Sequence, residues 1–186
     1  MARLVVAGVL ALLVAGLVGG GLVGGSLAGA RPAILPAATF EDQDGRTLKL
    51  EALRGHVVVI VYGGRAGLDH HVSWGRRLDV ELRGRGVYRL EDPSDARPVH
   101  ILAVAQMGGI PGPFRGMLQR YLRQHVERGF SLWLDWEDLL STLFGANEPV
   151  STVVVADGEG AVRLVVSGFP AGPPYTAVSE LLRSLL

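Results

Sequence analysis

Three short apolar runs, each followed by a helical pattern, constrain the fold of this chain more than any other feature. The first, residues 56–62, is rich in β-branched side chains and does not alternate between apolar and polar positions. Such a run is typical of a central strand that is covered on both faces. Residues 99–106 and 130–135 repeat the pattern. Strands that alternate with helices predict parallel strands joined by crossover helices.

Helical periodicity follows each run. Residues 68–83 place their apolar side chains roughly on one face, and the same character recurs further along the chain, in residues 114–129, 136–145 and 176–186. We expect Asp135 to cap the helix at 136–145, with Asp138 as its capping-box partner.

Two turn signals predict antiparallel pairs. Asp44–Gly45 separates the strand-like pieces 38–41 and 47–50, and Asp157-Gly158-Glu159-Gly160 interrupts the β-branched segment 151–168. Antiparallel pairs at both ends of the strand–helix units imply an α/β chain with a central mixed sheet and helices on both faces.

The N-terminus resembles an export signal. Arg3 precedes residues 4–30, which carry no charge and end in the small-residue pattern Ala28-Gly29-Ala30. The segment is read as a signal peptide cut after Ala30 or as an uncleaved membrane anchor, since it is long enough to cross a bilayer. Residues 31–37 would then be a linker and residues 38–186 the folded domain. We expect a periplasmic or otherwise extracytoplasmic protein, secreted or anchored to the inner membrane through residues 4–30.

Composition excludes several functions. With 18 basic and 18 acidic residues the formal net charge is zero, so the chain lacks the basic footprint that nucleic acid requires. Lys49 is the only lysine and lies in no glycine-rich loop. The chain has no cysteine, which removes disulfides, thiolate nucleophiles and thiolate metal sites. No cofactor is expected.

Two segments carry a resemblance to a known family. FEDQDGRTLKLEALRGHVVVIVY (40–62) and STVVVADGEGAV (151–162) are similar to the opening and the late strand of the thioredoxin-like superfamily, in its secreted redoxin and peroxiredoxin-like branch. The resemblance extends over residues 36–186. It implies a three-layer α/β/α fold with an N-terminal β-hairpin extension.

A smaller periplasmic group, the YtfJ-like proteins, is a nearer resemblance. It rests on Gly63-Gly64-Arg65 after the first central strand and on Ile110-Pro111-Gly112 before the middle helix. The likeness implies compartment and fold more than activity.

The resemblance also shows what is missing. The family's C-x-x-C motif would fall on Gly67-Leu68-Asp69-His70, and its cis-proline on Ser151, two residues after Pro149. Thiol–disulfide exchange and thiol peroxidase chemistry both need a thiolate, which this chain cannot supply. No catalytic residue is therefore expected at the former cysteine positions Gly67 and His70.

Binding chemistry can remain at this turn. A helix that begins after a glycine-rich turn offers free N–H groups and a partial positive charge to a carboxylate, a sulfate or a peptide carbonyl. The candidate ligand-binding residues are Gly64, Arg65, Asp69, His70 and Ser151. The alternative is that the glycines only make the bend and Arg65 is a solvated surface residue.

No metal site is expected. His70 and His71 are adjacent and diverge by about 100° on a helix, so they are poorly placed to share one ion. The remaining histidines, at 56, 100 and 125, have no spacing that predicts convergence. The tryptophans at 74, 133 and 136 are read as core or cover, with a carbohydrate or peptide platform as the alternative.

These patterns favour an exported thioredoxin-like domain that acts as a non-redox binding or scaffold module of the cell envelope. Its partner would be an envelope protein or a small anionic or peptide ligand. Two alternatives stay open: a diverged redoxin-type enzyme with a non-thiol activity through His70 and Arg65, or an inactive partner subunit of a thiol oxidoreductase.

Overall fold

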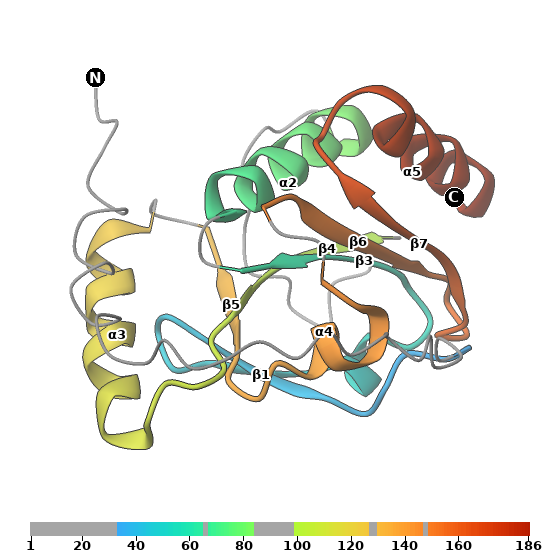
Figure 1. The fold of residues 1–186 in the computed structure, drawn as a ribbon. Helices are drawn as coiled ribbons and strands as arrows, with labels where there is room; N and C mark the ends of the chain where they lie inside the picture. Colours follow the sequence, from blue (N-terminus) through green and yellow to red (C-terminus); the bar gives the residue numbers. More distant parts are fainter. Residues whose placement is uncertain (1–32, 65–66, 84–98, 127–129, 147–148) are drawn as a thin grey trace, which may run out of the picture. The chain divides into compact units, whose positions relative to one another are not determined.

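The computed structural model describes residues 33–64, 67–83, 99–126, 130–146 and 149–186. In these ranges seven strands form one mixed sheet, in the order β2-β1-β5-β4-β3-β6-β7 (Figure 1). The strands are β1 (Thr39–Asp42), β2 (Thr47–Lys49), β3 (Val57–Gly63), β4 (Val99–Gln106), β5 (Leu132–Asp135), β6 (Ser151–Ala156) and β7 (Val162–Gly168). Helices of the described ranges lack the combination of length and apolar character that a membrane crossing requires.

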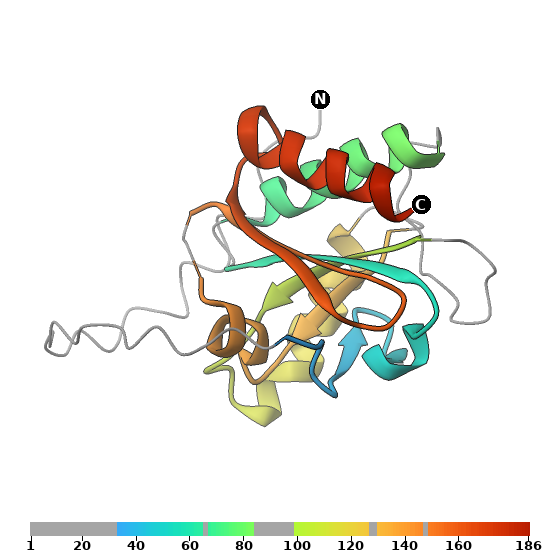
Figure 2. The same ribbon diagram turned by 90° about the vertical axis from the view of Figure 1, so that its right-hand side faces the viewer.

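Helices lie on both faces of the sheet. They are the 3-10 helix η2 (Leu50–Leu53) and the α-helices α2 (Leu68–Arg83), α3 (Gly112–His125), α4 (Leu139–Phe144) and α5 (Gly172–Leu185). The long helices α2 and α5 lie side by side over one face, while α4 lies on the other (Figures 1 and 2). The predicted α/β class, with a mixed sheet between helical layers and an N-terminal hairpin, is confirmed.

Strand direction follows the connections. β3, β4 and β5 are parallel to one another, β6 pairs antiparallel with β3, and β7 pairs antiparallel with β6. The hairpin of β1 and β2 joins the far side through an antiparallel pairing of β1 with β5. As the unbroken apolar run predicted, all seven residues of β3 are buried.

Two apolar cores enclose this central strand. Val57, Val59 and Val61 of β3 face the core that contains Trp74 of α2 and Val178 of α5, to which α3 contributes Leu122. The alternate β3 residues face a second core, which contains Trp133, Leu140 and Phe144. The tryptophans at 74 and 133 are therefore core residues, as the sequence predicted, and are at most 2 % exposed.

Helix α4 begins three residues later than its pattern predicts. The N-cap position is Asp138 rather than the predicted Asp135. The carboxylate of Asp135 nevertheless accepts hydrogen bonds from the N–H groups of Leu139 at 3.0 Å and Leu140 at 2.9 Å. Asp138, however, has a positive φ of 50°. Its carboxylate accepts a hydrogen bond from the N–H of Gly108, at 2.8 Å, so it is not the predicted capping-box partner.

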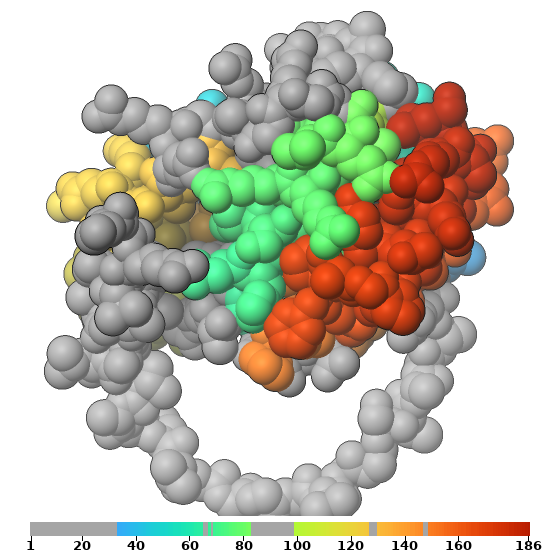
Figure 3. Space-filling view, turned by 90° about the horizontal axis from the view of Figure 1, so that it is seen from above, coloured from blue at the N-terminus to red at the C-terminus, as the bar shows by residue number. Residues whose placement is uncertain are grey.

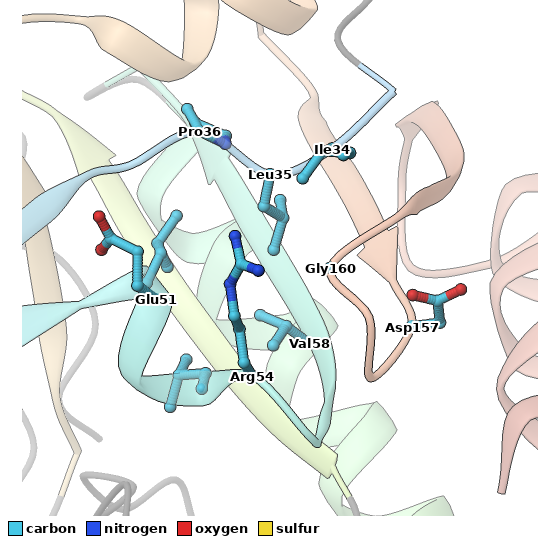
Figure 4. Close-up of a pocket in the computed structure, with 10 residues that line it drawn as sticks. Ile34, Leu35, Pro36, Glu51, Arg54, Val58, Asp157 and Gly160 are labelled. Atoms are coloured by element: carbon cyan, nitrogen blue, oxygen red, sulfur yellow. The ribbon is translucent and has the colours of Figure 1, made fainter.

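The segment before β1 lies against the turn between β6 and β7. The N–H of Leu35 donates to the carbonyl of Gly160, and the N–H of Val162 donates to that of Ala33, each at 2.8 Å. A pocket of about 20 Å³ lies between this segment, η2 and the turn, where Arg54 extends toward residues 35 and 36 (Figure 4). That volume holds about one water molecule. The predicted leader, residues 1–30, lies outside the described residues.

Candidate functional site

A row of small residues crosses the sheet where β3 ends. Gly63 pairs with Ala105 of β4, and Ser151 pairs with Gly168 of β7. The antiparallel register of β3 and β6 brings Gly63 beside Ser151, one position beyond their last recorded pair. Four neighbouring strands therefore leave space above the sheet at the first turn of α2.

The imidazole of His71 occupies this space. A Cβ atom added to Gly63 would stand 2.6 Å from Nε2 of His71, and one added to Gly67 would stand 3.2 Å from the same atom. The ring therefore lies against the α-carbons of both glycines. His71 has no exposed surface, although it lies in the first turn of a helix.

Three hydrogen-bonding atoms at this position have no partner in the described part of the chain. They are Nδ1 and Nε2 of His71 and Oγ of Ser151, and all three are buried. An unsatisfied buried donor or acceptor costs about 1–3 kcal/mol, so native structures rarely keep several together. Burial, and secondarily the neighbouring His70, lowers the pKa of His71 from 6.5 to about 4, which keeps the ring neutral at pH 7.

The loop before β6 closes the site from the other side. A Cβ atom at Gly67 would stand 2.9 Å from the carbonyl oxygen of Pro149, which is a backbone atom that moves only with its loop. Pro149 therefore lies beside the start of α2. Gly67, where the resemblance would place the first cysteine, has no room for a side chain.

The structure distributes the predicted ligand-binding residues unevenly. Gly64 is buried after β3, and Ser151 is buried on β6. Asp69 is exposed, and His70 is half-buried with its ring edge-on to Phe169, at 4.8 Å between centroids. Arg65 lies outside the described residues. The site thus has a buried part at Ser151 and an accessible part at His70.

The sequence interpretation favoured His70 and missed His71. A signal was present, because Trp74 and Leu78 follow His71 at helical spacings of three and seven residues and both are fully buried. These spacings place the imidazole on the apolar face of α2. The interpretation considered only the apolar side chains of residues 68–83 and so left His71 out of that face.

Another histidine pair meets at the opposite end of the sheet. His100, on β4, has its Nε2 2.8 Å from Nδ1 of His56, which precedes β3. The two ring nitrogens therefore share a hydrogen bond. No spacing in the sequence predicted this contact. In the described ranges, no group of three or more potential metal ligands converges.

Helices α2 and α5, which lie next to each other on the face shown in Figure 3, are joined by a polar cluster. Beside it is an open depression of about 550 Å³. Tyr175, Ser179 and Arg183 of α5 all donate hydrogen bonds to the carboxylate of Glu81. The bonds from Ser179 and Tyr175 are the main cause of the lowered pKa of Glu81. Burial, and then Glu81, raises the pKa of Tyr175 to about 12. This cluster holds the two helices together.

Comparison with known proteins identifies the fold. No family model matches the chain, and no curated protein matches it. Several solved structures match the chain. A thiol-disulfide isomerase from Corynebacterium glutamicum has a TM-score of 0.55 at 18% identity, with 82% of this chain and 95% of that chain covered.

Two further solved structures agree. The exposed lipoprotein thioredoxin of Streptococcus pneumoniae has a TM-score of 0.53 at 15% identity, covering 81% of this chain and 100% of its own. A protein from Chlorobium tepidum, described as a DsbE thiol:disulfide interchange protein, has a TM-score of 0.56 at 18% identity, covering 84% and 99%. At such identities the likeness concerns the fold alone. The chain therefore has the thioredoxin-like fold of these thiol–disulfide proteins, built without a single cysteine.

Proposed function

We propose that this chain is an exported, non-redox binding module whose ligand site lies where β3 ends and α2 begins. The observation that carries the proposal is the set of unpaired polar atoms on His71 and Ser151. His71 follows His70, where the resemblance would place the second cysteine, and Ser151 stands where it would place the cis-proline. A site that keeps buried hydrogen-bonding atoms but has no thiol can serve recognition and not thiol exchange.

The accessible side of the site supports binding from solvent. Phe169, at the end of β7, is 50% exposed and contacts the half-buried ring of His70. An exposed aromatic side chain beside buried polar groups is typical of recognition surfaces. A ligand would first contact Phe169, His70 and Asp69, and then reach Ser151 and His71 behind them.

Absence of cysteine makes this proposal directly testable. A single Phe169→Cys substitution in the full chain allows a photoreactive label to be attached at that site alone. With an envelope fraction we expect a discrete adduct that is lost when Ser151→Ala is added. The matched control is a label at Val80→Cys, because Val80 is on α2 and 55% exposed. Equal labelling from both positions, or an adduct indifferent to Ser151→Ala, contradicts the proposal.

The non-redox part has its own test. The purified chain is expected to show no insulin disulfide reduction and no thiol-dependent peroxidase turnover, because neither reaction proceeds without a sulfur nucleophile. Turnover by a sample free of contaminating thiol proteins would overturn this part.

Export is proposed from residues 1–30. Two of the similar structures bear names of extracytoplasmic type, an exposed lipoprotein and a DsbE protein. Cell fractionation should place the chain outside the cytoplasm, and N-terminal sequencing should find Arg31 first if the segment is removed after Ala30. Recovery in the cytoplasm would contradict export.

We further propose that the nearer kinship is with the periplasmic YtfJ-like group. The proposal rests on Gly63-Gly64-Arg65 and on Ile110-Pro111-Gly112. The packing of Gly63 against His71 gives the first of these segments a structural reason, since a larger residue would displace the imidazole.

A further inference from the structure

The unpaired atoms of His71 and Ser151 belong to one face of the sheet. Side chains alternate along a strand, so Ser151 points the same way as Val153 and Val155. Those two valines share the apolar core with Trp74 of α2. The hydroxyl of Ser151 therefore faces α2. The imidazole of His71, which belongs to α2, packs against Gly63 on this same face of the sheet.

Hydrogen-bond donors gather at this point. Ser151 offers an O–H, and the neutral imidazole of His71 offers one N–H. The N-terminus of α2, the positive end of its helix dipole, lies at this same turn. Asp69, the acidic residue of this first turn, is exposed rather than buried with them. The site is therefore suited to a ligand that accepts hydrogen bonds.

We propose that this site binds a small oxyanion, a carboxylate, sulfate or phosphate group, between Oγ of Ser151 and the ring of His71, with uptake of one proton by the imidazole. This inference rests on the binding function proposed above and names its ligand class.

Proton uptake follows from the burial of the site. A buried anion without a counter-charge is costly, whereas an imidazolium supplies a hydrogen-bonded counter-charge that neutralises a carboxylate and lowers the net charge of a bound sulfate or phosphate. Within the described residues, the strands present the uncharged Gly63 and Ser151 to the ring, and α2 contributes His70 and Asp69 as titratable neighbours. The charged residues Arg65 and Glu148 lie outside the described residues. In the empty site, burial favours the neutral imidazole. A bound anion favours the protonated imidazolium instead, because the two charges attract each other. Affinity for the anion should therefore rise as the pH falls below neutrality.

Entry requires a local opening. His71 and Ser151 have no exposed surface, and the carbonyl of Pro149 lies against Gly67. The carbonyl of Pro149 must move away from Gly67 to admit the ligand. The group that enters is small: a free anion, or the carboxylate terminus of a peptide.

The test is calorimetric titration of the full chain with sodium acetate and sodium sulfate at pH 5.5 and 7.5, at constant ionic strength. Binding should be tighter at the lower pH, by up to about tenfold per pH unit. Repetition in buffers of different ionisation heat should count about one proton taken up. Ser151→Ala should weaken binding by about tenfold, and His71→Gln should abolish its pH dependence.

Matched controls are Ser184→Ala and His125→Gln, whose side chains are exposed on α5 and α3. Both should bind like the unaltered chain. A tripeptide with a free carboxylate terminus, compared with its amide, distinguishes the two sources of the anion: binding of the acid form alone identifies a peptide terminus, and binding of acetate or sulfate identifies a free anion.

No binding of any probe at either pH overturns the oxyanion site. Binding that is independent of pH and unchanged by Ser151→Ala overturns it as well, as an adventitious ion only. Photoadducts at position 169 that persist while no anion binds refute the oxyanion and leave the binding function standing. If neither a photoadduct at position 169 nor anion binding is observed, both proposals are refuted.

Discussion

Nε2 of His71 stands 2.6 Å from the point where a Cβ at Gly63 would lie. The glycine is therefore required by the histidine and not only by the bend that follows β3. Gly63 on β3 and His71 on α2 are eight positions apart in the chain. Their contact leaves no room for a larger side chain at position 63.

Gly63→Ala is expected to lower the free energy of unfolding by about 1–3 kcal/mol, the usual cost of overpacking a core. The clash is with the end of a side chain, so His71→Ala in the same chain should recover much of the loss. Urea unfolding of the two single variants and the double variant measures this coupling. Gly116→Ala, on α3 with no atom within 4 Å of its added Cβ, is the control and should be neutral or stabilising. Additive effects of Gly63→Ala and His71→Ala would contradict the contact.

Gly67→Ala should also destabilise the chain, by about 1–3 kcal/mol, but for a different reason. Its Cβ would stand 2.9 Å from the backbone carbonyl of Pro149, closer than it stands to His71. Removal of the imidazole therefore should not restore stability, in contrast to the result at Gly63. Full recovery in the Gly67→Ala/His71→Ala chain, by the same unfolding assay, would show that the loop before β6 is not the obstacle.

Stability should fall in acid because of His71. Its pKa is about 4 in the folded chain against 6.5 ordinarily. The unfolded state therefore takes up the proton first as the pH falls, and stability present above pH 6.5 is lost toward pH 4. Relative to His71→Leu, the unaltered chain should lose at most about 1.4 kcal/mol per pH unit in this window. If the unfolding free energies of the unaltered chain and of His71→Leu changed equally from pH 7 to pH 4, the ring would not be buried as a neutral group.

Glu81→Gln should loosen the contact between α2 and α5. Glu81 accepts hydrogen bonds from three α5 side chains, but its side chain is 25% exposed, so we expect a loss of about 1 kcal/mol at pH 7. Its pKa is lowered in the folded chain, so this contribution is present above pH 4.5 and disappears as the pH falls through the folded value. Thermal unfolding measures the difference, and the exposed Glu180→Gln on α5 is the control. An equal effect from both substitutions would refute a specific bridge.

Much of the architecture was predictable because it depends on local pattern. The strand β3 and the helix α2 have almost the bounds that their apolar periodicities predict. The start of α4 was not predictable, because it depends on Asp138 adopting a positive φ while its carboxylate binds Gly108. That partner lies 30 residues away in the chain, and no local pattern encodes it.

The candidate site divides in the same way. Composition alone shows that no thiol chemistry is available, and the alignment of short motifs brought Ser151 and the start of α2 into one hypothesis. The selection of His71 rather than His70 required the packed structure. Adjacent side chains on a helix diverge by about 100°, and docking of α2 on the row of small residues decides which one is buried. Local sequence can specify a strand, a turn and a helix, because each depends on neighbouring residues, whereas the buried imidazole depends on four strands meeting beneath it.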